Sequence, residues 1–125
     1  LESKAKTIMP SLLEILKNEE KISFKTQTGK LFEKRMDIMA IVSDAKISYI
    51  YSKFQNKKTI LEPLGDITER IEYGKLIRIG RQHIINLNYV YEINRKARTC
   101  TLRNDDKLII LDLSESACVE LEEKL

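Results

Sequence analysis

Short segments with the period of a β-strand set the strongest limit on the fold of this chain. Apolar and polar residues alternate in most of these segments, while 38–42 is a continuous apolar run suited to a strand that is buried on both faces. The candidate strands lie at 21–26, 30–34, 38–42, 47–52, 57–61, 90–94, 99–103 and 108–111. Because so many short strands leave little room for helix, the pattern predicts a mainly β domain of antiparallel sheets with small flanking helices.

Three segments carry helical signals. Residues 7–18 have an apolar stripe, with Pro10 suited to the first turn, and we expect residues 1–19 to form a linker helix before a domain at 20–125. This helix either docks on the domain or connects it to a preceding one. A second short helix is expected near residues 64–71, and a third after the capping-box pattern at 112–115. The chain starts without a methionine, so we expect it to be a fragment of a longer protein.

Composition favours a globular domain and gives no sign of an enzyme. The 125 residues are 42% hydrophobic and 33% charged, and no apolar run approaches the roughly 20 residues of a membrane helix. Cys100 and Cys118 lack metal-ligand spacing, so we expect free buried thiols in a reducing cytoplasm. The pair Asp105-Asp106 reads as a solvated hairpin turn. With no catalytic or phosphate-binding motif, we expect no enzymatic activity, no cofactor and no metal.

The charges are unevenly distributed along the sequence. Residues 74–107 hold eight cations and three anions, a net charge of +5, whereas residues 108–125 carry a net charge of −4. A basic segment of this kind suits a surface that faces phosphates. Local imbalances are also common in a chain with so many charged residues, so the distribution alone leaves both readings open.

The segment 76–90 combines donors with a buried strand. Arg78, Arg81, Gln82 and His83 stand directly before a short apolar run that ends at Asn86. Arginine can form two hydrogen bonds with guanine, and glutamine can do the same with adenine. The alternatives are that Arg78 pairs with a carboxylate such as that of Glu72 and that His83 packs against the sheet.

These features occur in an order that closely resembles the LytTR DNA-binding domain. The resemblance covers residues 20–125, and no single motif in it is specific alone. It rests on Asp37-Ile38-Met39-Ala40-Ile41, on the short helix with Leu64-Gly65-Asp66-Ile67-Thr68-Glu69, on the run from Arg78 through Arg81, Ile84 and Ile85 to Asn86, and on the turn Asn104-Asp105-Asp106 before a terminal helix. It implies an elongated fold of antiparallel sheets with about ten short strands.

The resemblance also implies which residues contact DNA. Three loops carry the contacts in the family, and in this chain they hold Lys46 and Ser48, then Gly80-Arg81-Gln82, then 111–114. Arg81 and Gln82 would read bases, while Lys46, Ser48, Lys53 and Arg78 would hold the backbone or groove. Lys57 and Lys58 are weaker phosphate candidates. Two positions depart from the family pattern: Gly80 replaces its histidine, and the third loop contains Asp112 in place of a serine–arginine pair.

Family members are mostly bacterial transcription regulators, in which this domain follows a receiver domain of a two-component system. We therefore expect a cytoplasmic, sequence-specific domain that reads major grooves of promoter repeats through loops, pairing as a homodimer on the DNA. A receiver or sensor domain would precede it. The alternative is a protein-interaction module that keeps the fold but has lost specific DNA readout, which Asp112 and the acidic C-terminal segment favour.

Overall fold

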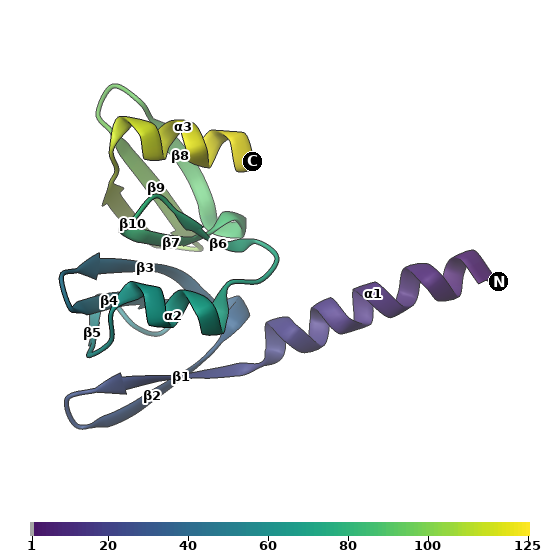
Figure 1. Cartoon of the computed structure of the whole chain (residues 1–125). Helices are drawn as coiled ribbons and strands as arrows, with labels where there is room; N and C mark the ends of the chain where they lie inside the picture. The colour runs from purple at the N-terminus through teal and green to yellow at the C-terminus, as the bar shows by residue number, and fades with distance from the viewer. Residues whose placement is uncertain (1) are drawn as a thin grey trace.

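The computed structural model describes the backbone of residues 2–125 and the side chains of residues 11–125. Over that part of the chain, ten strands alternate with a few helices (Figure 1). The helices are α1 (Glu2–Glu19), α2 (Leu64–Ile71), α3 (Glu115–Lys124) and the 3-10 helices η1 (Arg35–Asp37) and η2 (Leu87–Tyr89). The strands are β1 (Lys21–Thr26), β2 (Gly29–Lys34), β3 (Ile38–Asp44), β4 (Ile47–Ser52), β5 (Lys58–Ile60), β6 (Leu76–Ile79), β7 (His83–Asn86), β8 (Val90–Asn94), β9 (Thr99–Asn104) and β10 (Lys107–Asp112). The predicted mainly β fold is confirmed.

The strands form three antiparallel sheets. The central sheet has the order β5-β4-β3-β7-β6, β1 pairs with β2, and the third sheet has the order β10-β9-β8. Figure 1 shows the central sheet as the middle layer, with the three-stranded sheet and α3 on one side and α2 with the β1–β2 hairpin on the other. Of the run 38–42 that was predicted to be buried on both faces, residues 38–41 are fully buried because both faces of the strand are covered, and Val42 is half-buried.

Each face of the central sheet packs against its own hydrophobic core. Neighbouring residues of a strand point to opposite faces, so Ile84 of β7 enters the core on the α2 side and Ile85 enters the core on the α3 side. Phe24 contributes to the first core, and Leu102 and Leu121 contribute to the second. The central sheet is therefore fixed from both sides, which gives the turns at its ends a rigid support.

Three local predictions differ from the structure. Helix α1 begins at residue 2, so Pro10 lies inside it and not in its first turn. The N-cap of α3 is Ser114, whose Oγ accepts the Ala117 N–H at 3.1 Å, while Asp112 still belongs to β10. An N-cap must directly precede the first helical residue, which explains the shift from the predicted position. Residues 76–79, which were not among the predicted strands, form strand β6.

Arg35 joins the C-terminal ends of two helices. Its side chain is only 4% exposed, and its guanidinium donates to the carbonyls of Lys17, Arg70 and Ile71 at 2.7, 3.2 and 2.9 Å. Carbonyls in the last turn of a helix lack partners within the helix and attract cations. Helix α1 is therefore attached to the body of the molecule by its last turn, and the remainder projects outward (Figure 1). Among the described helices, none is long and apolar enough to cross a membrane.

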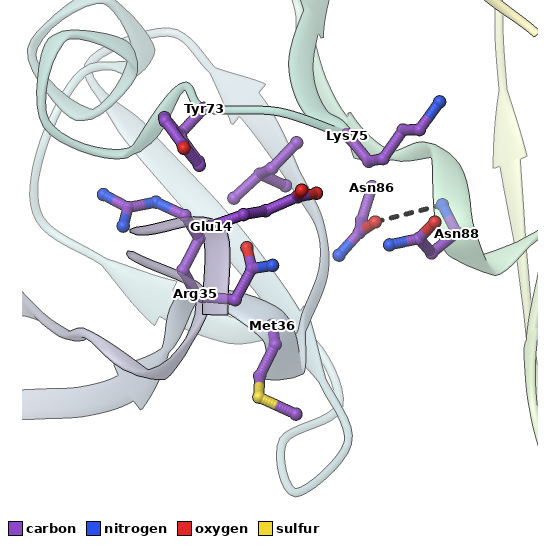
Figure 2. A pocket seen from close by; sticks show the side chains of 9 residues that line it. Glu14, Arg35, Met36, Tyr73, Lys75, Asn86 and Asn88 are labelled. Carbon is purple, nitrogen blue, oxygen red and sulfur yellow. Dashed lines mark hydrogen bonds between the residues drawn. The ribbon is translucent and has the colours of Figure 1, made fainter. Parts of the chain in front are cut away.

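A small polar cavity of about 40 Å³ lies beside this junction (Figure 2). Glu14 of α1, Tyr73, Lys75 and Asn86 contribute to its lining. A polar space of this size holds only a few water molecules and cannot enclose a nucleotide. The cavity also lies where Leu76 pairs with Asn86, at the end of β6 and β7 opposite to the turn that joins them. It is therefore not a candidate for the predicted DNA contacts.

Candidate nucleic-acid interface

Three segments that are distant in the sequence meet at one end of the molecule. Residues 45–46 join β3 to β4, residues 80–82 join β6 to β7, and residues 113–114 join β10 to α3. The Ser43 N–H donates to the Gln82 carbonyl at 2.7 Å, which holds the first turn beside the second. Residue 114 lines a groove together with residues 80–83, which places the third segment beside the second. We call these three segments the turn end, which lies at the left of Figure 1.

The β6–β7 turn presents two adjacent donor side chains. Arg81 and Gln82 are both exposed. Gly80 has a φ of +63°, a left-handed conformation that glycine adopts without steric cost, and its N–H donates to a carboxylate oxygen of Glu120 in α3 at 2.9 Å. The base of the turn is thus bonded to a helix, while the two side chains face solvent. This placement agrees with the prediction that Arg81 and Gln82 directly precede a buried strand.

Arg78 supports this turn from behind. It lies in strand β6, which was not predicted, and its side chain is half-buried. Its guanidinium donates to the Arg81 carbonyl at 2.9 Å. Its link to Glu72 is made by the backbone N–H, at 2.8 Å, and not by the guanidinium as the sequence-based alternative supposed. The Arg78 side chain therefore fixes the backbone of the residue next to Gln82.

The β3–β4 turn adds a second set of polar groups. Lys46 is exposed beside Ala45, whose φ is +59°. The Tyr49 hydroxyl donates to the Asp44 carboxylate at 3.0 Å, and this bond raises the pKa of the tyrosine. Lys57 lies with its Nζ 5.0 Å from the centre of the Tyr49 ring, a cation–π arrangement. The Tyr49 ring thereby holds Lys57 near the turn end. Tyr49 and Lys57 line one cleft between the sheets together with Gln82.

Three other predicted contact residues lie away from this surface. Ser48 is fully buried and donates its hydroxyl to the Glu62 carbonyl at 2.9 Å, so its side chain has no exposed atom to offer to DNA. Lys53 follows the opposite end of β4 from Lys46 and pairs with Asp37 at 3.6 Å. Lys58 is exposed on the edge strand β5, opposite Ile50 in the middle of β4. The geometry therefore does not support a contact by Ser48 at the turn end, nor one by Lys53.

An acidic residue directly precedes the third segment of the turn end. Asp112 is exposed at the end of β10 and lines the same cleft as Gln82 and His83. His83 is buried, as the alternative reading of the sequence held. Burial lowers the pKa of its imidazole, while a backbone hydrogen bond with Asp112 and the charge of that residue act in the opposite direction. His83 is thus a packed residue of β7, and Arg81 and Gln82 are the outward-facing groups.

Comparison with known protein families and solved structures identifies the family of this chain. The family model described as the LytTr DNA-binding domain matches residues 28–125. This chain belongs to that family. A solved structure of similar fold is described as the LytTr DNA-binding domain of a methyl-accepting/DNA response regulator from Bacillus cereus, with 19% sequence identity and a TM-score of 0.60. The match covers 82% of this chain and 94% of that one. No curated protein matches the sequence.

Membership of the LytTR family makes DNA the partner class of this domain. Of the predicted contact residues, the turn end brings together Lys46, Arg81 and Gln82 as exposed side chains, with Arg78 behind them. Tyr49 was not among the predicted site residues, and its position beneath Lys57 is a feature that sequence reasoning missed. Alternation along β4 places Tyr49 and Tyr51 on the face opposite to Ile50, but the sequence alone does not show which of the two faces is the more exposed.

Proposed function

We propose that this LytTR domain binds double-stranded DNA sequence-specifically through the turn end, as the output domain of a cytoplasmic bacterial transcription regulator. The observation that carries the proposal is the pair of exposed side chains Arg81 and Gln82 on a turn held by Arg78 and Glu120. Arginine and glutamine are the residue types that recognise guanine and adenine in the major groove. A turn fixed at its base presents these groups with little freedom to lose on binding.

The neighbouring cations would contact the DNA backbone. Lys46 is exposed in the adjacent turn, and Lys57 extends over Tyr49 toward the same cleft. Contacts with phosphates position a protein on the duplex without reading its sequence. In this arrangement, the β3–β4 turn and the β6–β7 turn enter the major groove. A second copy of the domain binds an adjacent repeat in the promoter. A receiver or sensor domain preceding α1 would control the binding.

Selection from a pool of random duplexes tests this function. The domain is incubated with the pool over a series of salt concentrations, and the bound fraction is sequenced. We expect a repeated motif to be enriched and log K to fall linearly with log salt, because cations that bind phosphates displace condensed counterions. Weak binding without any enriched motif would contradict sequence-specific recognition.

Arg81→Ala tests the role of the turn directly. Loss of a bidentate arginine should weaken binding to the selected motif by about 1–3 kcal/mol and relax the preference at one position, with a much smaller effect on random duplex. Arg103→Ala is the matched control, because Arg103 is also an exposed arginine but lies near the end of strand β9 that points away from the turn end. Equal losses on the motif and on random duplex would exclude base reading by Arg81.

A protein-interaction module is the second candidate, and Asp112 is the observation that favours it. An exposed carboxylate beside Gln82 repels phosphates and occupies the position where the family has a serine–arginine pair. If the domain has this second function, binding to duplex DNA should be unselective and disappear by physiological salt. The selection experiment therefore separates the two candidates.

A further inference from the structure

The β8–β9 turn is a basic feature that the turn end does not include. Residues 95–98 read Arg-Lys-Ala-Arg, and all four are exposed. The turn has a defined shape: the Asn94 side chain accepts the Ala97 N–H at 2.9 Å, and Arg98 takes a left-handed conformation with a φ of +56°. Its cations are therefore displayed on a fixed backbone.

This turn is continuous with the turn end. The Leu113 N–H donates to the Arg98 carbonyl at 2.9 Å, and Asp112 pairs with Thr99 at the adjoining ends of β10 and β9. Leu113 belongs to the segment that lies beside the β6–β7 turn. In Figure 1 the β8–β9 turn stands above the start of α3, on the same side of the molecule as the β3–β4 turn. One row of turns thus runs from Lys46 past Arg81 to Arg98.

The three cations of the turn differ in how firmly they are held. Arg95 is bonded through two nitrogens to the Glu122 carboxylate, which raises the pKa of its guanidinium. The Arg98 guanidinium is 3.9 Å from Glu115, and both side chains are mostly exposed, an arrangement that contributes little to stability. No described residue pairs with the Lys96 ammonium. Lys96 and Arg98 are therefore the cations free to meet another anion.

Acidic residues near the start of α3 explain why a DNA backbone bound here would need additional cations. Asp112 and Glu115 place two carboxylates on this side of the turn end, and they would repel a phosphate backbone laid across it. Arg98 lies 3.9 Å from Glu115, and together with Lys96 of the same turn it would offset this repulsion. Lysine and arginine in turns most often contact phosphate oxygens, which fix the register of a protein on the duplex.

We propose that Lys96 and Arg98 of the β8–β9 turn bind backbone phosphates of the duplex that the turn end reads, forming a fourth contact region beside Asp112 and the third segment. The proposal rests on the proposed DNA-binding function. It assigns these two side chains to affinity and positioning, and it leaves base recognition with Arg81 and Gln82.

The experiment compares two charge-matched double variants. Lys96→Gln with Arg98→Asn removes both cations, and asparagine suits the left-handed backbone at position 98. Lys75→Gln with Lys124→Gln removes two exposed lysines from the other end of β6 and of α3. Both variants and the parent are titrated with the selected duplex and with a random duplex between 50 and 200 mM salt, and thermal unfolding verifies that each is folded.

We expect the Lys96/Arg98 variant to bind both duplexes more weakly by the same factor. Its slope of log K against log salt should be shallower by about 1.8, so that the affinity gap from the parent narrows roughly tenfold over the salt range. A parental slope, or an equal loss in the Lys75/Lys124 control, would overturn the assignment of phosphate contacts to this turn. Failure of the parent itself to bind any duplex would instead refute the proposed function, and the inference with it.

Discussion

At the scale of single residues, His83 is a titratable group buried in the central sheet. It is the one histidine in the sequence, and it lies buried at the start of β7 beside Asp112. Burial disfavours the charged imidazolium, so the pKa of His83 lies below its usual value of 6.5 in the folded protein. The unfolded chain therefore binds the proton more readily than the folded one between the two pKa values.

This difference predicts a pH-dependent stability. As pH falls through 6.5 toward the lowered folded pKa, the free energy of unfolding should decrease, by about 1.4 kcal/mol for each pKa unit that separates the two states. His83→Gln should remove this contribution. Urea unfolding of the parent and the variant at pH 7.5, 6.5 and 5.5 measures it. A stability difference between the two proteins that is constant over this range would show that His83 keeps its ordinary pKa.

Exposure of individual residues could be predicted only where a turn signal was present. Arg81 and Gln82 follow a glycine and precede an apolar run, so their placement in a turn was visible in the sequence. Ser48 shows the limit. Alternation along β4 separates its residues into two sets, but it does not say which set faces the core when one set holds serines and the other tyrosines. The deciding interactions are hydrogen bonds from Ser48 and Ser52 to partners distant in sequence.

At the scale of elements, α3 depends on a single cap. Ser114 accepts the Ala117 N–H, and the helix that follows bonds the base of the β6–β7 turn through Glu120. Ser114→Ala should lower the free energy of unfolding by about 1 kcal/mol, because it leaves an N–H of the first turn without its partner. Ser116→Ala removes an exposed hydroxyl that lies 3.1 Å from the Ser114 Oγ but leaves the cap on the Ala117 N–H in place, so it should change the free energy of unfolding by less than about 0.5 kcal/mol. Chemical denaturation measures both, and equal effects would contradict the capping role.

The elements themselves were largely predictable, with one informative exception. Strands at 21–26, 38–42 and 47–52 follow from their period, since burial on a pleated surface requires it. Strand β6 was missed because its four residues do not alternate clearly and begin only a short distance after helix α2. What makes it a strand is pairing with β7, in which Ile77 lies opposite Ile85. A short edge strand of this kind is specified by its partner more than by its own residues.

At the scale of the whole molecule, one sheet shared by two cores predicts a single unfolding transition. Ile84 and Ile85 are neighbours on β7 that enter different cores, and both are fully buried. Replacing either by valine should cost about 1 kcal/mol, with the same denaturant dependence as the parent. Circular dichroism and tyrosine fluorescence should give coincident curves for both variants. Separate transitions for the two substitutions would mean that the cores unfold independently.

The order of strands in the central sheet was beyond the reach of the sequence. β7 inserts beside β3 although more than thirty residues separate them, while β4 and β5 lie on the other side. This order brings the β3–β4 turn next to the β6–β7 turn. The family resemblance implied that both turns contact DNA, but only the pairing of Val42 with His83 explains why they lie together.

The side chains proposed to meet DNA lie in turns, whereas both cores consist of strand and helix residues. Positions 46, 81 and 82 are exposed, and none of their side chains contributes to either core. Substitutions there change the chemistry offered to a duplex at little cost to folding. Under the proposed function, the preferred DNA sequence can therefore diverge between related genomes while the scaffold stays intact, and duplicated copies would acquire separate sets of target genes through a few exchanges in these turns.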